Sequence, residues 1–441
     1  MITLLKYELE PNDENLKETI KKNFLGRNSK LVMLSKLLVN VKENLTISVD
    51  GQWGSGKTFF IKQFKYLVDH IEDYIDNSII NDDDKQSLKN LHETNIIVYY
   101  NAWENDMHTN PLESLIYNIL NEYPKMKNQI ADFNDFKKMF KSFCRDFLYS
   151  ASGNLFDINN LDQINSFDDL EKNIKIIEKK KTAFNKLVDE ILEDKLRLIL
   201  IIDELDRCKP TFAVEMLETI KHFYTNDKIT IIVSTNNSEL SNTIKNYYGS
   251  DFDGYGYLNK FYDFIISLEI KDIKIYLQNQ LNFCNRPFIY HDLSYLVMNY
   301  FDFSLRECNR FVIFYNMLKE YIESEKHFNK DLYYINACIF VPIALALKIK
   351  DVNKYNLFIS KKGEKIITDF LDSEIIGTDY QRWLGEIIKF ENANDFKKKI
   401  LDTYYEIFNT EYSYERFPFF EAISLLGTQI LINSKENNDN N

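Results

Sequence analysis

A glycine-rich loop that ends in lysine and threonine is the strongest chemical signal in this chain. Its pattern, G-x-x-x-x-G-K-[ST], is filled by Gly51, Gln52, Trp53, Gly54, Ser55, Gly56, Lys57 and Thr58. Such a loop binds phosphates because its backbone N–H groups point inward and its glycines put no Cβ atoms in the way. We therefore expect this loop, with Phe59 after it, to bind a nucleoside triphosphate. Lys57 is expected on the β- and γ-phosphates and Thr58 on Mg²⁺.

The surroundings of the loop are those that phosphate binding requires. A short β-branched run, residues 45–49, precedes it, and a helical pattern over residues 59–70 follows it. The N-terminus of a helix carries about half a unit of positive charge, which faces a bound anion. A glycine-rich turn that happens to precede Lys-Thr is the alternative, and this context makes it the weaker interpretation.

Two carboxylates follow a second buried strand. Asp203 and Glu204 come directly after the apolar run of residues 197–202. We expect Asp203 to hold the shell of Mg²⁺ through water. Glu204 is expected to be the general base that polarises a water for attack on the γ-phosphate. A pair of solvated carboxylates is the alternative, which the phosphate-binding loop again makes the weaker interpretation.

Arg207, three residues further on, has two interpretations of equal weight. In the first, it is an arginine finger that reaches a γ-phosphate across a subunit interface. In the second, it pairs with Asp206 or Glu204 and only shapes the turn. The first interpretation implies a homo-oligomer.

Three other polar residues are candidates for contact with the γ-phosphate. Asn236 and Thr235 follow the apolar run at 229–233, and one of them could sense the γ-phosphate or orient the water. The alternative is that their polarity is that of an ordinary turn. Arg306 follows Ser304, a predicted helix N-cap. It either reaches phosphates from a helical lid, so that the nucleotide state moves the lid, or is solvated.

Five short apolar runs define the predicted sheet: residues 45–49, 96–100, 197–202, 229–233 and 264–268. Near-continuous apolar strands separated by helical stretches are typical of a parallel sheet covered on both faces. We therefore predict a three-layer α/β fold. Apolar residues at spacings of three and four also predict a helix over residues 16–43.

The rest of the chain is predicted to be helical. A long segment rich in Lys, Phe, Asn and Asp, at about residues 123–195, is expected to be a helical insertion within a core that spans residues 1–270. Residues 271–433 are expected to form a C-terminal α-helical region. The polar, Asn-rich tail, residues 434–441, is expected to be disordered.

Composition narrows the class of protein. The 54 Lys and Arg against 67 Asp and Glu give a net charge of −13, which weighs against a dedicated nucleic-acid coat. Five scattered cysteines form no C-x-x-C and make a poor disulfide framework or zinc site. The longest apolar run, Ala337–Leu347, is about half of the roughly 20 residues that cross a bilayer. The N-terminus lacks the layout of a signal peptide, so we expect a cytoplasmic protein with no integral membrane segment.

Three strings together resemble the KAP family of P-loop NTPases. They are Asp50–Thr58 around Trp53 and Lys57, then Tyr99-Tyr100-Asn101-Ala102-Trp103-Glu104, and Asp-Glu-Leu-Asp-Arg-Cys at 203–208. The resemblance covers about residues 20–315. It implies a nucleotide-hydrolysing core of the additional-strand class, in which another strand separates the P-loop strand from the acidic strand. The order along the chain, with 96–100 between these two, agrees with that expectation.

The resemblance also bears on function. It implies the roles given above for Lys57, Thr58, Asp203 and Glu204. Many family members carry membrane helices between the P-loop and the acidic motif, whereas the segment at 123–195 is polar and charged. Bacterial relatives are often associated with resistance to phages or plasmids, so antiviral defence is an expected setting.

The function expected from these features is a Mg²⁺-dependent ATPase switch that self-associates. ATP is favoured over GTP because the chain has no Asn-Lys-x-Asp guanine reader. The first alternative is a non-hydrolysing, nucleotide-dependent scaffold that recruits a partner effector protein. The second is a nucleic-acid motor, which the acidic charge disfavours.

Overall fold

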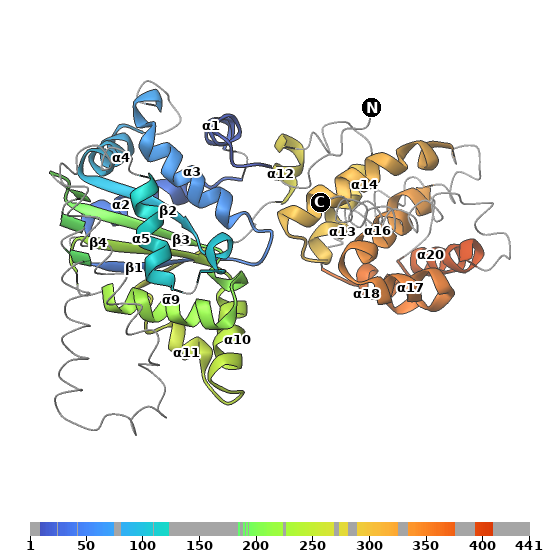
Figure 1. Ribbon diagram of the computed structural model, residues 1–441. Coiled ribbons are helices and arrows are strands. Elements are labelled where there is room, and N and C mark those ends of the chain that lie inside the picture. Colours follow the sequence, from blue (N-terminus) through green and yellow to red (C-terminus); the bar gives the residue numbers. More distant parts are fainter. Residues whose placement is uncertain are drawn as a thin grey trace, which may run out of the picture. The chain divides into compact units, whose positions relative to one another are not determined.

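The computed structural model forms two compact units, one spanning Glu10–Glu269 and the other combining Ile270–Asn441 with Met1–Leu9 (Figure 1). It describes residues 9–23, 25–41, 43–74, 81–108, 110–122, 184–185, 188–189, 191–192, 194–223, 226–268, 273–280, 289–324, 334–374 and 393–408. Most of the predicted insertion at about 123–195 lies outside these residues. The predicted tail at 434–441 lies outside them entirely.

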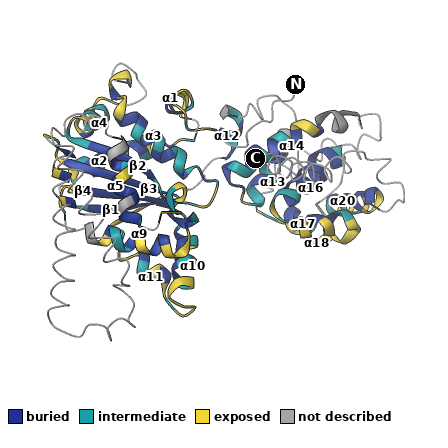
Figure 2. Ribbon diagram, in the orientation of Figure 1, coloured by how far each residue is buried: buried dark blue, intermediate teal, exposed yellow. Residues whose placement is uncertain are grey.

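A five-stranded parallel sheet forms the centre of the first unit, in the order β2-β3-β4-β1-β5. Its strands are β1 (Leu45–Asp50), β2 (Asn95–Asn101), β3 (Arg197–Asp203), β4 (Ile229–Thr235) and β5 (Phe264–Ser267). All five predicted strands are confirmed to within one or two residues at each end. Every residue of β3 and β4 is buried, which explains the apolar run Leu198–Ile202 in β3 and the predominance of Ile and Val from Ile229 to Val233 in β4 (Figure 2).

The sheet belongs to the additional-strand class, but the separating strand is not the one expected from the order along the chain. β4 lies between β1 and β3, whereas β2, which contains residues 96–100, lies at the edge beyond β3. The burial of the two strands agrees with the observed order. β4 is buried at all seven positions, as an interior strand must be, whereas β2 keeps three half-buried positions.

Helices cover both faces of the sheet and complete the three layers (Figure 1). Side chains of β1, β3 and β4 pack on one face against α1 (Asp13–Lys22), α2 (Asn28–Asn40), α3 (Lys57–Asp69) and α4 (Asp82–Thr94). The other face packs against α5 (Pro111–Glu122), α9 (Pro210–Phe223), α10 (Asn237–Tyr248) and α11 (Gly254–Leu258). Short 3₁₀-helices follow α3, β2 and β3: η1 (Ile71–Tyr74), η2 (Trp103–Asn105) and η4 (Leu205–Arg207).

The prediction of one helix over residues 16–43 is wrong, because α1 and α2 are separate helices. Asn23 ends α1 in the left-handed conformation, with φ 47°, and donates its N–H to the carbonyl of Ile20. Gly26 then takes a second positive φ of 64°. The apolar positions behind the prediction, Leu31, Leu34, Leu38 and Val41, all lie in α2 or at its end, so they carried no information about the residues before Asn28. The connection between the two helices carries Arg27 toward the phosphate-binding loop.

Every described element of the second unit is helical. Its elements are α12 (Ile273–Gln280), α13 (Ile289–Tyr300), α14 (Leu305–Ser324), the π-helix η6 (Asn336–Phe340), α16 (Val341–Lys350), α17 (Val352–Leu357), the π-helix η7 (Phe358–Lys362), α18 (Glu364–Leu371) and α20 (Ala393–Phe408). Ser304 caps α14 as predicted. Its hydroxyl accepts the N–H of Glu307 at 3.3 Å, and the Glu307 carboxylate accepts the N–H of Ser304 at 2.8 Å.

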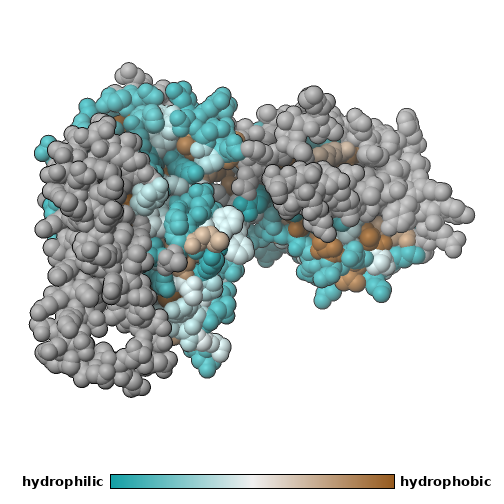
Figure 3. Space-filling model, viewed as in Figure 1, coloured by the Kyte–Doolittle hydropathy of each residue, from teal (hydrophilic) through white to brown (hydrophobic). Residues whose placement is uncertain are grey.

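The longest apolar run in the chain is part of the core of the second unit. All residues from Ala337 to Leu347, in η6 and α16, are buried. Among the residues described, no helix combines the length and the apolar character needed to cross a membrane. On the face drawn in Figure 3, most described residues of the Glu10–Glu269 unit are hydrophilic.

Candidate functional site

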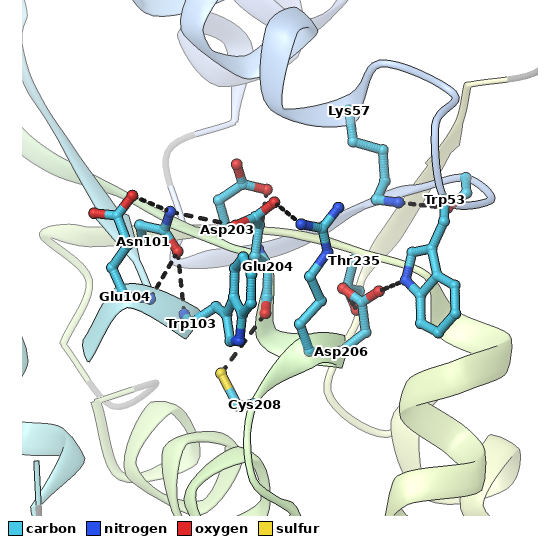
Figure 4. Close-up of polar contacts among 12 residues, drawn as sticks. Trp53, Lys57, Asn101, Trp103, Glu104, Asp203, Glu204, Asp206, Cys208 and Thr235 are labelled. Atoms are coloured by element: carbon cyan, nitrogen blue, oxygen red, sulfur yellow. Dashed lines mark hydrogen bonds and ion pairs between the residues drawn. The ribbon is translucent and has the colours of Figure 1, made fainter. Parts of the chain in front are cut away.

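The candidate site lies where the strands of the sheet end. In the register of the sheet, Asp50 pairs with Thr235, Ser234 with Asp203, and Asp203 with Asn101. The residues that follow β1, β2, β3 and β4 therefore meet at one edge, which is the usual place for a ligand in an open parallel sheet. Figure 4 shows side chains from all four segments within one group of polar contacts.

The loop after β1 has the conformation of a phosphate cradle. Gly54 and Gly56 have φ values of 80° and 85°, which only glycine adopts readily. A Cβ on Gly51 would lie 2.7 Å from Oγ of Ser55, so a side chain there would force the Ser55 hydroxyl to move. The backbone therefore favours glycine at 54 and 56, and the packing of Ser55 favours it at 51.

The same loop leaves hydrogen-bonding groups for a ligand. Gly56 is the N-cap of α3 and offers no side-chain cap, so the first N–H groups of the helix keep their capacity to bind an anion. Oγ of Ser55 is buried and makes no hydrogen bond within the described part of the chain. The loop thus fits a phosphate group. Thr58 and Phe59 lie in the first turn of α3, as the predicted roles require.

Lys57 is buried in the loop and binds the loop's own carbonyls. Its Nζ donates to the carbonyl oxygens of Gly51 at 2.6 Å and Gln52 at 3.3 Å. Burial lowers the pKa of Lys57, and the charges of Asp206 and Asp203 act in the opposite direction. The acidic motif is therefore within electrostatic reach of the loop lysine, as predicted from the sequence.

Two residues outside the loop hold it in place. Arg27 is buried and donates through Nη2 to the carbonyl of Ser55 at 2.8 Å. On the other side, Nε1 of Trp53 donates to Oδ2 of Asp206 at 2.5 Å (Figure 4). Sequence reasoning gave neither contact, although Asp206 stands in one of the three strings that resemble the family.

Asp203 is fully buried at the end of β3 and points to the face of the sheet that α3 covers. Ile201 and Ile199, two and four residues before Asp203, pack in the same core as that helix. Because side chains alternate along a strand, Asp203 lies on their face of the sheet. Its Oδ1 accepts the N–H of Glu204 at 3.0 Å, and its Oδ2 accepts the hydroxyl of Tyr99 at 3.0 Å. Burial and the carboxylate of Asp203 raise the pKa of Tyr99, so its hydroxyl remains a donor. The Tyr99 hydrogen bond is a third contact that the sequence analysis missed.

Glu204 is held in an uncommon backbone conformation, with φ 61° and ψ 28°. A residue other than glycine costs about 1–3 kcal/mol in this region, and such residues cluster at functional sites. The N–H of Glu204 donates to the carbonyl of Ser234 at 3.1 Å, which ties the end of β3 to β4. Burial raises the pKa of the Glu204 carboxyl, and the charge of Arg207 works against that rise.

Among the described residues, the side chains of Arg207 and Asn101 contact the carboxylate of Glu204. Nη1 of Arg207 lies 2.7 Å from Oε1, and Nδ2 of Asn101 donates to Oε2 at 3.3 Å. The guanidinium of Arg207 also lies over the Trp103 ring, 5.4 Å from its centroid. Of the two interpretations of Arg207, the structure has the pair with Glu204. Asn101 was not a predicted site residue, although Asn-Ala-Trp directly after a buried strand was a usable signal.

The remaining predicted residues lie in different surroundings. Thr235 is buried on the opposite face from Asp203, and its Oγ1 donates to Oδ1 of Asp206 at 3.2 Å. Asn236 is half-buried before α10 and makes no capping hydrogen bond with its side chain. Arg306 lies in the first turn of α14, in the other unit, so its contact with phosphates stays a prediction.

Comparison with known proteins agrees with this geometry. The model of the KAP family P-loop domain matches residues 27–286, which is more than half of the 441 residues. No curated protein matches the chain. The match contains the phosphate-binding loop, Asn101 and the acidic motif. The chain therefore belongs to the KAP family of P-loop domains.

Proposed function

We propose that this protein is a Mg²⁺-dependent ATP hydrolase that acts as a nucleotide-driven conformational switch. The observation that carries the proposal is the hydrogen bond from Trp53 in the P-loop to Asp206 in the acidic motif, at 2.5 Å. It joins segments 153 residues apart in the sequence. A cradle for phosphates and the carboxylates needed for hydrolysis are thereby held at the same edge of the sheet.

In this proposal each residue has one role. The N–H groups of the loop and Nζ of Lys57 bind the phosphates. Thr58 and Asp203 would hold Mg²⁺, which neutralises charge on the β- and γ-phosphates. Magnesium usually keeps several waters and takes only one or two carboxylates, which suits a site with one buried aspartate. Glu204 accepts a proton from the attacking water while the water oxygen bonds to the γ-phosphorus. The bond between the γ-phosphorus and the oxygen that bridges it to the β-phosphate breaks, and ADP leaves.

The contacts of Glu204 favour a second candidate function. Its carboxylate is neutralised by Arg207 and hydrogen-bonded by Asn101, so it is not available as a base in the arrangement described. A protein that keeps this arrangement with ATP bound would be a nucleotide-dependent scaffold that recruits a partner effector protein. Hydrolysis is the preferred function because both contacts are side-chain pairs that rotate without unfolding the site.

The first test is the metal and nucleotide dependence of phosphate release. We expect the protein to release phosphate from ATP in Mg²⁺ and to lose at least about a hundredfold in rate when EDTA removes the metal, because the metal contributes several kcal/mol to the transition state. GTP should be hydrolysed more slowly. Metal-independent hydrolysis would contradict the assignment of Thr58 and Asp203. ATP binding without turnover, with ATP-dependent capture of a partner, would favour the scaffold.

Arg207→Ala separates the two roles of this arginine. We expect hydrolysis by the variant to rise about two- to tenfold, because a half-buried ion pair that restrains Glu204 is worth about 0.5–1.5 kcal/mol. The acid limb of the pH–rate profile should also move to higher pH. Arg207 lowers the pKa of Glu204, so without it the base becomes protonated earlier as pH falls. A loss of about a thousandfold or more would instead identify Arg207 as an arginine finger.

The biological setting is a further part of the same proposal. We propose a cytoplasmic homo-oligomer in bacterial defence against phages or plasmids, with Arg207, Arg306 or another arginine acting between subunits. The support is the family match at residues 27–286. A nuclease or other toxic effector encoded beside this gene would support the setting. DNA-stimulated hydrolysis that weakens with salt would favour a nucleic-acid motor instead.

A further inference from the structure

Asp206 is a buried carboxylate that no step of the proposed hydrolysis uses. Its side chain is only 8% exposed, yet it accepts the indole N–H of Trp53 at 2.5 Å and the hydroxyl of Thr235 at 3.2 Å (Figure 4). Hydrogen bonds to an ionised carboxylate are about twice as strong as those between neutral groups. Asp206 therefore fastens the middle of the P-loop to the end of β4.

Trp53 is held by this hydrogen bond rather than by burial. The residue is 47% exposed, and the next position, Gly54, has a left-handed φ of 80°. A large side chain at a flexible loop position is free to turn unless a directional contact fixes it. Arg27 fixes the loop from the other side, at the carbonyl of Ser55. Of these two supports, only that of Trp53 leads to the acidic motif.

A single tight turn connects Asp206 to the restrained base. In the one-turn helix η4 (Leu205–Arg207), the N–H of Arg207 donates to the carbonyl of Glu204 at 3.1 Å. Asp206 and Arg207 are neighbours in that turn, so a displacement of one moves the other. Arg207 in turn holds the Glu204 carboxylate at 2.7 Å. A continuous chain of contacts thus runs from the P-loop to the general base.

We propose that Trp53 and Asp206 are positioning residues that couple the filling of the P-loop to the release of Glu204 from Arg207. The inference rests on the proposed ATP hydrolysis. A triphosphate in the loop displaces Trp53, and Asp206 carries that displacement into η4. The hydrogen bond therefore matters for the rate of hydrolysis more than for nucleotide binding, because the loop N–H groups and Lys57 bind phosphate without it.

The test is a double-mutant cycle of ATP hydrolysis with Trp53→Phe, Asp206→Ala and the double variant. Each single variant should lower kcat about tenfold, the lower end for a hydrogen bond to a charged group, with KM changed less than about threefold. Because both remove the same contact, the double variant should lose no more than either single variant. Asp206→Asn keeps an oxygen acceptor for the indole and should restore kcat to within about threefold of wild type.

Tryptophan fluorescence supplies a readout that a merely structural role does not change. The difference in emission between wild type and Trp53→Phe isolates Trp53. We expect this emission to shift when ATP is added. The shift should be lost in Asp206→Ala, because without its carboxylate partner the indole is not held in one position that filling of the loop can change. Trp53→Phe alters a half-exposed side chain and keeps an aromatic ring at that position, so its result stands even if Asp206→Ala fails to fold.

Several results would overturn the inference and leave ATP hydrolysis standing. These are losses that multiply in the double variant, an effect confined to KM, or an emission shift that persists in Asp206→Ala. A wild-type protein whose ATP turnover is absent or does not depend on Lys57 would overturn the proposed function itself, and the inference with it. The two failures are therefore distinguishable in the same set of assays.

Discussion

Lys57→Ala is expected to lower kcat/KM for ATP by about 10²–10³-fold, the effect of removing one preorganised donor from a charged transition state. The physical reason is the position of Nζ. It lies inside the loop, 2.6 Å from the carbonyl of Gly51, and a phosphate in the loop would take the place of that acceptor. Alanine leaves the backbone cradle intact but removes its only side-chain cation. Phosphate release and equilibrium binding of ATP measure the two parts of the effect.

Lys21→Ala is the matched control for this prediction. Lys21 is exposed in the last turn of α1, outside the loop and the acidic motif. The Lys21→Ala variant should keep the rate of phosphate release and the affinity for ATP within about twofold of wild type, as surface substitutions usually do. Sustained turnover by Lys57→Ala would show that the loop is not the site of hydrolysis.

Glu204→Gln is expected to lower kcat by about 10²–10⁴-fold, the usual contribution of a general base. Glutamine has nearly the same shape and still bonds to Asn101, but it cannot accept a proton from water. Binding of ATP should persist or become tighter, because the P-loop is unchanged and a negative charge near the phosphates is removed. Single-turnover hydrolysis and equilibrium binding together separate loss of chemistry from loss of binding.

Glu239→Gln controls for the loss of one carboxylate on the same unit. Glu239 lies in the first turn of α10, beyond the end of β4, and should tolerate glutamine with less than about a twofold change in kcat. If Glu204→Gln hydrolysed ATP like wild type, another residue would have to activate the water. If it lost ATP binding as well, Glu204 would be a binding residue rather than the base.

Local sequence was a good guide to the elements and a poor guide to their neighbours. The strands were predictable because buried parallel strands are apolar on both faces, and β3 and β4 are buried at every position. Their order was not, because nothing in residues 96–100 or 229–235 records which strand enters between β1 and β3. The break at Asn23 was missed for a different reason, since the apolar positions behind that prediction all lie beyond it, between Leu31 and Val41.

The loop and acidic residues of the candidate site were predictable from the sequence, whereas the contacts between distant segments were not. Residues of the loop, with Asp203 and Glu204, were predictable because each follows a recognisable strand and has the chemistry that phosphates require. The contacts of Arg27, Asn101 and Asp206 were not, because each joins segments far apart in the chain through one side chain. Arg27 bonds across 28 positions, and Trp53 meets Asp206 across 153. Such pairs become visible only when the topology brings the strand ends together.

A crystal structure of Glu204→Gln grown with ATP and Mg²⁺ tests the central claim most directly. We predict a triphosphate bound by the backbone N–H groups of residues 51–58, with Nζ of Lys57 turned from the Gly51 carbonyl to the phosphates. The metal should lie between Thr58 and Asp203. A nucleotide bound elsewhere on the protein, or a loop that stays closed on Lys57 at saturating ATP, would contradict the account.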